Sequence, residues 1–339
     1  MRRLISFGCA AFLSVGTCHA QSSATLYGIL DSGLVVEGGG PSGKVVKLGG
    51  GVSAGSRWGL QGKEDLGGGY SLNFVLESGF NVNNGTLNAG GGLFGRQATI
   101  AVDGPYGNVQ MGRQYSLVYL AVTSVADPFR TGSAGRANNI LQIGGSRVDN
   151  SVRYHSPSWF GFSGDVLYSF GGVAGDFPAG RHIEGGLNYA NGPLEGRFIY
   201  STYNNTPTAA APALVTTRTT LATLAYDFSP VKVSLAYADN GGNPALDSRD
   251  LLVGLTYDFG VSRLAASFIN HADHSAANAD VNQYALGYYY NLSKRTSLYV
   301  IGAIMQRKNA AAQNTFFVGN ASDTGSGNRA LNLGIKHNF

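Results

Sequence analysis

The chain has 339 residues, a formal net charge of +4 and only 13% charged residues, about half the roughly 25% typical of soluble domains. Its 50 glycines are about twice the usual share, and glycine costs about 1 kcal/mol in a helix interior, which disfavours a helical protein. No apolar stretch reaches the ~20 residues of a membrane helix, and 11% aromatic residues disfavour disorder. The composition therefore indicates a large all-β protein.

The first twenty residues resemble a secretory signal peptide. They begin with Arg2 and Arg3, continue as an apolar run and end in Cys18-His19-Ala20, a small-residue cleavage pattern. We expect cleavage to leave residues 21–339 as one mature domain. Cleavage would remove both cysteines of the chain, and with them any disulfide, and would lower the formal charge to +2. The basic charge of the full chain is therefore no argument for nucleic-acid binding.

A period of two in side-chain character continues along most of the mature chain. In residues 251–257, for example, Leu251, Val253, Leu255 and Tyr257 alternate with smaller or more polar residues. Such alternation predicts strands with one apolar face and one small or polar face. About 16 segments of this kind, each of the length that a tilted outer-membrane strand needs, are expected. They lie near 24–36, 55–64, 69–80, 93–103, 107–115, 148–157, 161–171, 181–190, 194–203, 218–228, 231–239, 249–258, 261–271, 280–291, 296–307 and 329–339.

The connections between these segments alternate between short and long. Short ones carry turn residues, as in Asp103-Gly104-Pro105-Tyr106 and Asn191-Gly192-Pro193. The long ones are rich in glycine, alanine and asparagine, and are expected at 37–54, 81–92, 116–147, 204–217 and 308–328. Short turns at one rim and long loops at the other are typical of an up-and-down barrel that spans a membrane.

Aromatic residues near the strand ends support this interpretation. Five tyrosines beside short turns could form an aromatic girdle at the membrane interface: Tyr154, Tyr189, Tyr226, Tyr257 and Tyr290. The last segment alternates up to the terminal Phe339. Because a closed barrel must pair its last strand with its first, we expect Phe339 to take part in barrel closure.

Several short motifs resemble those of the general porins of Gram-negative outer membranes, in particular the β-proteobacterial branch. In chain order they are Thr25-Leu26-Tyr27-Gly28, Ser56-Arg57-Trp58-Gly59-Leu60, Glu64-Asp65-Leu66-Gly67-Gly68-Gly69, Leu76-Glu77-Ser78-Gly79-Phe80, Phe94-Gly95-Arg96-Gln97, Gly112-Arg113-Gln114, Asp149-Asn150-Ser151-Val152-Arg153-Tyr154 and His337-Asn338-Phe339. The ordered set covers essentially the whole mature chain. The resemblance implies a homotrimer of 16-stranded, water-filled barrels, with the third long loop folded into each pore as a constriction.

Three arginines are candidates for the basic wall of that constriction. Trp58 and Leu60 share the lipid-facing phase of their strand, so Arg57 should point inward, and Arg153 should do so by the same reasoning. The resemblance places Arg96 on the pore wall. A charge on the lipid face at mid-membrane costs roughly 2–4 kcal/mol, so lumen-facing arginines are the physical default. The direction in which Arg113 faces is left open.

Residues 116–147 are the longest gap between strands and should form the constriction loop. We expect apolar residues, among them Phe129, Ile140, Leu141 and Ile143, to anchor it to the inner wall. Its charged members are Asp127, Arg130, Arg136 and Arg147, and Asp149 follows close by. The family often places several acidic residues here, whereas this loop has only Asp127. Its field should therefore be positive.

The sequence thus predicts an outer-membrane channel for passive diffusion of ions and small hydrophilic solutes, with a preference for inorganic anions and without cofactor, metal or enzymatic activity. Gly51-Val52-Ser53-Ala54-Gly55 matches a nucleophile-elbow pattern but lacks the required strand and helix around it. His271 and His274 lie in a loop, a poor match to a zinc site. The alternatives are a substrate-specific channel for sugars or organic acids, an outer-membrane β-barrel enzyme, and a soluble β-sandwich or adhesin.

Overall fold

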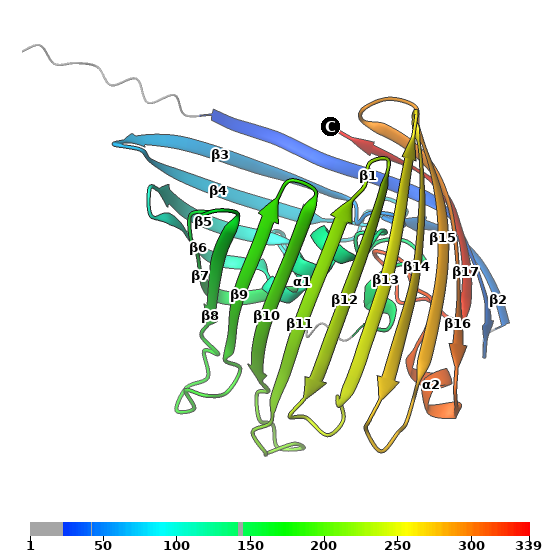
Figure 1. The fold of residues 1–339 in the computed structure, drawn as a ribbon. Coiled ribbons are helices and arrows are strands. Elements are labelled where there is room, and N and C mark those ends of the chain that lie inside the picture. Colours follow the sequence, from blue (N-terminus) through cyan, green and yellow to red (C-terminus); the bar gives the residue numbers. More distant parts are fainter. Residues whose placement is uncertain (1–22, 42, 142–144) are drawn as a thin grey trace, which may run out of the picture.

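The computed structural model describes residues 23–41, 43–141 and 145–339. The expected signal peptide and the expected anchor Ile143 lie outside these ranges. The described chain forms one antiparallel sheet that closes on itself, as Figure 1 shows. Its strands are β1 (Ser23–Gly40), β2 (Gly43–Gly50), β3 (Arg57–Gly67), β4 (Tyr70–Gly79), β5 (Gln97–Gly104), β6 (Gly107–Tyr115), β7 (Arg147–His155), β8 (Phe162–Ser169), β9 (His182–Asn191), β10 (Leu194–Asn204), β11 (Thr216–Asp227), β12 (Val231–Gly241), β13 (Ser248–Phe259), β14 (Ser262–Asp273), β15 (Val281–Asn291), β16 (Thr296–Arg307) and β17 (Arg329–Asn338).

These segments make a barrel of sixteen strands because β2 and β3 are two pieces of one. Both pair antiparallel with β1, β3 along residues 23–29 and β2 along residues 32–40. The sixteen predicted segments are all present, so the predicted all-β barrel is confirmed. The expected long loop at 37–54 is wrong, because β1 and β2 continue through most of it as a hairpin. Its glycines favoured a loop interpretation, but they lie within these strands.

The barrel closes between β1 and β17, which pair in register from Ile29 opposite Asn338 to Gly38 opposite Arg329. The terminal residue extends this ladder: the Phe339 N–H donates to the Gly28 carbonyl at 3.0 Å, and the Gly28 N–H donates to the Phe339 carbonyl at 3.1 Å. A Cβ atom at residue 28 would lie 2.3 Å from Cζ of Phe339. A glycine is therefore required where the terminal ring crosses the first strand.

The two faces of the wall have different side chains. Along β13, Leu251, Val253 and Leu255 are exposed on the outside, while Leu252 and Gly254 between them are buried on the inside. The short turns gather at one rim, at the top of Figure 1, and the longer loops at the other. Aromatic pairs lie beside the short turns, for example Tyr226 with Phe228. None of the helices in the described ranges is long and apolar enough to span a membrane.

Residues 116–141, which follow β6, fold into the barrel. They contain α1 (Leu117–Ala121), the π-helical turn η1 (Val122–Ala126) and the 3₁₀ turn η2 (Ala137–Asn139), and Figure 1 shows α1 behind the strands. The α1 and η1 segments pack against β9 to β13. A second short helix, α2 (Ala310–Thr315), lies in the loop before β17. We call residues 116–141 the constriction loop.

An apolar patch on the inner wall holds this loop. Fully buried inward-facing side chains from six strands form the patch: Leu167, Ile199, Leu221, Leu252, Ile269 and Ile301. The loop contributes Phe129, Ile140 and Leu141, each at most 3% exposed. Fully burying one such side chain stabilises by roughly 1.5–3 kcal/mol, so the patch explains why a loop leaves the rim to cross the lumen.

Candidate pore constriction

The constriction loop and the facing wall enclose a cavity of about 840 Å³. Seven cationic residues line it, against two acidic residues, Asp258 and Asp323. The cationic residues are Arg57, Arg96, Arg130, Arg136, Arg147, Arg263 and Lys336. Because they come from four strands, from the loop that precedes β5 and from the constriction loop, the positive charge surrounds the cavity rather than covering one wall.

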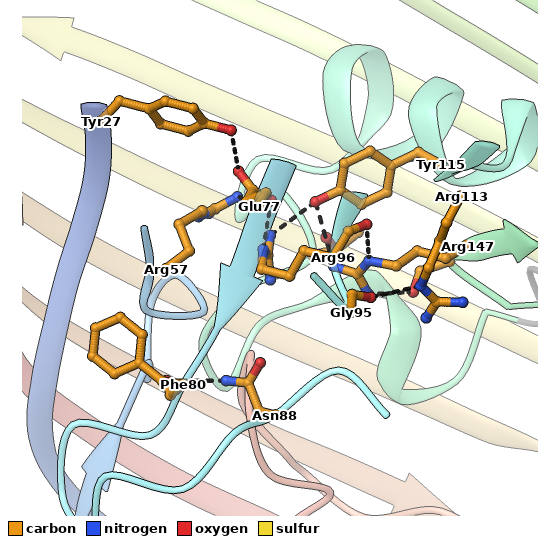
Figure 2. A network of polar contacts seen from close by, with 12 residues as sticks. Tyr27, Arg57, Glu77, Phe80, Asn88, Gly95, Arg96, Arg113, Tyr115 and Arg147 are labelled. Carbon is orange, nitrogen blue, oxygen red and sulfur yellow. Dashed lines mark hydrogen bonds and ion pairs between the residues drawn. The ribbon is translucent and has the colours of Figure 1, made fainter. Parts of the chain in front are cut away.

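Two arginines share one carboxylate on the wall formed by β3, β4 and the start of β5, as Figure 2 shows. Nε of Arg96 donates to Oε1 of Glu77 at 2.7 Å, and Nη1 of Arg57 lies 4.0 Å from the same oxygen. The Tyr27 hydroxyl donates to the second carboxylate oxygen, Oε2, at 3.0 Å. One carboxylate cannot neutralise two guanidinium groups, so this wall keeps a net positive charge.

Arg147 extends this wall through a shared tyrosine. The Tyr115 hydroxyl accepts from Nη2 of Arg96 at 2.8 Å and from Nη2 of Arg147 at 3.3 Å, and the Arg147 guanidinium lies 4.9 Å from the centre of the Tyr115 ring. Nε of Arg147 also donates to the Arg96 carbonyl at 2.9 Å. Arg147 was expected within the loop, but the structure places it as the first residue of β7. These contacts hold the two guanidinium groups beside the lumen.

The loop residues fall into two groups. Arg130 and Arg136 line the cavity, and burial lowers the pKa of Arg136 to about 10, which leaves it protonated at neutral pH. Asp127 does not line it. Its buried carboxylate accepts backbone N–H groups of Phe129, Thr131 and Ala137 at 2.8–2.9 Å and so fixes the turn of the loop. Burial raises the pKa of Asp127 to about 6, against the opposing effect of these donors.

The opposite wall adds two cations that the sequence analysis did not identify. Arg263 is the second residue of β14 and pairs with Asp258, with Nε 2.6 Å from Oδ1. Lys336 lies near the end of β17 and lines the same cavity as Arg57, Arg130 and Arg263. Both residues occupy the inward phase of their strands, which is the one signal that could have found them. Their approach to Arg57 depends on barrel closure, which periodicity does not show.

The remaining sequence candidates lie beside the cavity rather than in it. Arg153 is partly buried and pairs with Asp165, with Nε 2.8 Å and Nη2 2.7 Å from Oδ1, and it is not among the lining residues. Arg113 pairs with Asp149 and donates from Nε to the Gly95 carbonyl at 2.7 Å. Each pair joins two neighbouring strands, since Arg113 lies in β6, Asp149 and Arg153 in β7, and Asp165 in β8.

Both histidines were expected in a loop, but His271 lies within β14 (Ser262–Asp273), while His274 follows that strand and is exposed. His271 is buried against Asp250 on the inner wall, with Nδ1 2.5 Å from Oδ1. Within residues 23–41, 43–141 and 145–339, no group of three or more histidine, cysteine, aspartate or glutamate side chains could hold a metal ion.

Comparisons with known proteins agree with this architecture. Residues 8–310 match a family described as Gram-negative porin. An outer membrane porin protein of Bordetella pertussis is 33% identical over 384 residues, covering 96% of this chain and 96% of that protein. The outer membrane porin protein 32 of Delftia acidovorans is 29% identical, covering 97% and 98%. The structure of an anion-selective porin from Comamonas acidovorans superposes with a TM-score of 0.79 at 26% identity, covering 94% of this chain and 100% of that one.

The chain belongs to the Gram-negative porin family. It is a β-barrel of the outer membrane, with short periplasmic turns and long extracellular loops, and it forms a channel for passive diffusion of ions and small hydrophilic solutes. The constriction loop lies inside this barrel and borders the cavity described above.

Proposed function

We propose that this porin prefers anions, and that the cations around the cavity cause the preference. Seven cationic side chains against two acidic ones carry the proposal. Positive charge in a narrow, low-dielectric opening concentrates anions and repels cations. The name of the related porin from Comamonas acidovorans, which states that it is anion-selective, supports the same direction.

Seven residues are proposed to attract anions. They are Arg57, Arg96 and Arg147 on one wall of the cavity, Arg130 and Arg136 on the constriction loop, and Arg263 and Lys336 on the opposite wall. Arg153 was expected on the basic wall of the constriction, but it pairs with Asp165 outside the cavity. In this assignment Arg147 and Lys336 belong to the basic lining instead. Asp127 acts by shaping the loop, because its carboxylate is occupied by backbone donors.

The test is the reversal potential of the reconstituted channel in a potassium chloride gradient. The variant Arg57→Gln/Arg130→Gln/Lys336→Gln removes three charges that surround the cavity, and its reversal potential should move toward zero. The matched control is Lys294→Gln, which removes one positive charge from an exposed short turn and should leave the potential unchanged. An unchanged potential in the triple variant would contradict the assignment.

We further infer a homotrimer without enzymatic activity. The exposed apolar residues Leu26, Leu30 and Leu34 on the outer face of β1 could pack against a second subunit. A Vibrio cholerae outer membrane protein of the same fold, with a TM-score of 0.70 at 15% identity, has been solved in a trimer form. Cross-linking of detergent-solubilised protein tests the trimer, and incubation with phospholipid and peptide substrates tests for hydrolysis.

We also infer that residues 1–20 are cleaved on export. The N-terminal charge, the apolar run and the Cys18-His19-Ala20 pattern support this. N-terminal sequencing of protein purified from outer membranes should begin at Gln21.

A further inference from the structure

The wall of the barrel is interrupted between β2 and β3, where residues 51–56 fold into the lumen. We call these residues the inward segment. Val52 is fully buried within it, while Ser53, Ala54 and Gly55 line the cavity. The constriction loop is therefore not alone in narrowing the channel, since a second element enters from the first hairpin.

A single buried carboxylate holds this segment. Asp31 on β1 is 0% exposed, and its carboxylate accepts the backbone N–H groups of Val52, Ser53 and Ala54 at 2.8, 3.2 and 3.1 Å. The Tyr299 hydroxyl donates to Oδ1 of Asp31 at 2.8 Å. A carboxylate with four donors in a buried site fixes the backbone that supplies them, because each donor would otherwise be left without a partner.

The backbone of Asp31 holds the far end of the segment as well. Its N–H donates to Oγ of Ser56 at 3.0 Å, and its carbonyl accepts from the same hydroxyl at 3.1 Å. The Gly51 N–H donates to the Asp31 carbonyl at 2.6 Å. Asp31 thus contacts both ends and the middle of the inward segment.

The inward segment in turn supports two loops. The Val52 carbonyl accepts from Ser133 N–H of the constriction loop at 2.8 Å and from Ala321 N–H of the last long loop at 3.2 Å. The approach to the constriction loop is close, since a Cβ atom at Gly132 would lie 1.8 Å from the Ser53 carbonyl oxygen. At its other side, a Cβ atom at Gly55 would lie 3.0 Å from Nη1 of Arg96. The segment therefore connects the constriction loop with the arginine wall.

We propose that Asp31 is a positioning residue that sets the cross-section of the channel by holding the inward segment against the constriction loop. It touches no solute. It acts through the inward segment, in which Ser53 and Ala54 line the cavity and the Val52 carbonyl holds the N–H of Ser133. The inference requires a channel but does not depend on its anion preference.

The test is single-channel conductance of folded protein carrying Asp31→Asn. An amide has one acceptor oxygen, so the variant cannot hold all the donors of the carboxylate, and the inward segment should lose its fixed position. The expected result is a higher mean conductance and a wider spread among channels. A role confined to folding would lower the yield of folded protein and leave the conductance of each surviving channel unchanged, which would overturn the proposal.

A matched control separates position from charge. Asp258→Asn removes one negative charge from the lining of the same cavity but holds no part of the inward segment. It should change the reversal potential and with it the mean conductance, but leave the spread of conductance among channels as in the wild type. If Asp258→Asn widened that spread as much as Asp31→Asn does, charge alone would explain the result and the proposal would be wrong.

Two further variants leave the charge of the lumen unchanged. Tyr299→Phe removes one donor to Asp31, and Gly132→Ala places a methyl group against the Ser53 carbonyl. Both should widen the spread of conductance without moving the reversal potential. If Asp31→Asn does not fold, these two decide the question, and wild-type conductance in both would overturn the proposal.

Discussion

The Nε atom of Arg96 donates a 2.7 Å hydrogen bond to Oε1 of Glu77, the carboxylate oxygen that also lies 4.0 Å from Nη1 of Arg57. This arrangement explains how two guanidinium groups can stand side by side in the wall of a membrane channel. Glu77 offsets part of their repulsion without cancelling their charge, and the surplus faces the lumen.

Replacement of this carboxylate should therefore separate stability from selectivity. In Glu77→Gln the two arginines lose a buried counter-charge, and a lost hydrogen bond to a charged group costs about 1.5–3 kcal/mol. We expect the barrel to unfold at a lower temperature in detergent while the reversal potential shows stronger anion selectivity. A variant with unchanged selectivity would show that Glu77 does not control the field in the lumen.

Selectivity should also depend on pH through Asp127. Burial raises the pKa of Asp127 to about 6, so the side chain becomes neutral as the pH falls below that value and the loop becomes more positive. Anion selectivity should therefore increase between pH 7 and pH 5. In Asp127→Asn the part of this increase that is due to Asp127 should be absent. A wild-type dependence of selectivity on pH in that variant would show that Asp127 is not the titrating group.

The same shift has a consequence for the stability of the constriction loop. A carboxyl group whose pKa is higher in the folded state than in the unfolded chain stabilises the fold fully below the unfolded value, about 3.9 for aspartate. That contribution is lost as the pH rises through about 6. Limited proteolysis within residues 116–141 should accordingly be slower at pH 5 than at pH 7.

Gln283 should limit the motion of the constriction loop. Its amide donates to the carbonyls of Gly135 and Arg136 at 3.1 and 3.3 Å, and its oxygen accepts from Nδ2 of Asn139 at 2.9 Å. Gln283→Ala takes from the Gly135 carbonyl the side-chain donor it has in the wild type, at about 1–3 kcal/mol, whereas the Arg136 carbonyl still accepts from the Asn139 N–H. Single-channel records should show more open-channel noise, whereas quiet records would mean that the apolar patch alone fixes the loop.

A higher salt concentration should weaken the anion preference of the channel. The Debye length falls from about 10 Å at 0.1 M to 3 Å at 1 M, so the field of the cavity cations reaches less far across the opening. The permeability ratio of chloride to potassium, measured at a fixed concentration ratio, should decrease as both concentrations rise. A ratio independent of salt would indicate selection by size rather than by charge.

Alternation along the chain was enough to predict all sixteen strand positions, because each strand separates hydrocarbon from water. It did not predict β2, which together with the predicted β3 makes up one of the sixteen strands. Residues 37–54 are rich in glycine and resemble a loop. For the site, alternation specifies the face of a residue but neither its height nor its angle around the barrel. Arg57 was therefore placed on the lumen face, Arg153 was expected at a cavity that it does not line, and Lys336 was missed.

Asp31 shows a different limit of sequence reasoning. An acidic residue in an apolar strand can face the lumen as a solvated charge or be buried by another segment. Only the folded chain brings Val52 to Ala54 onto its carboxylate. The glycines around that segment were interpreted as loop residues, although one of them, Gly55, permits the close approach of Arg96.

The most direct measurement is the zero-current potential of the purified wild-type protein in a planar bilayer under a tenfold potassium chloride gradient at low salt. If cations surround the narrow part of the channel, conducting units should insert stepwise, and the sign of the zero-current potential should show that chloride is more permeant than potassium. A potential of the opposite sign, or none at all, would contradict the account.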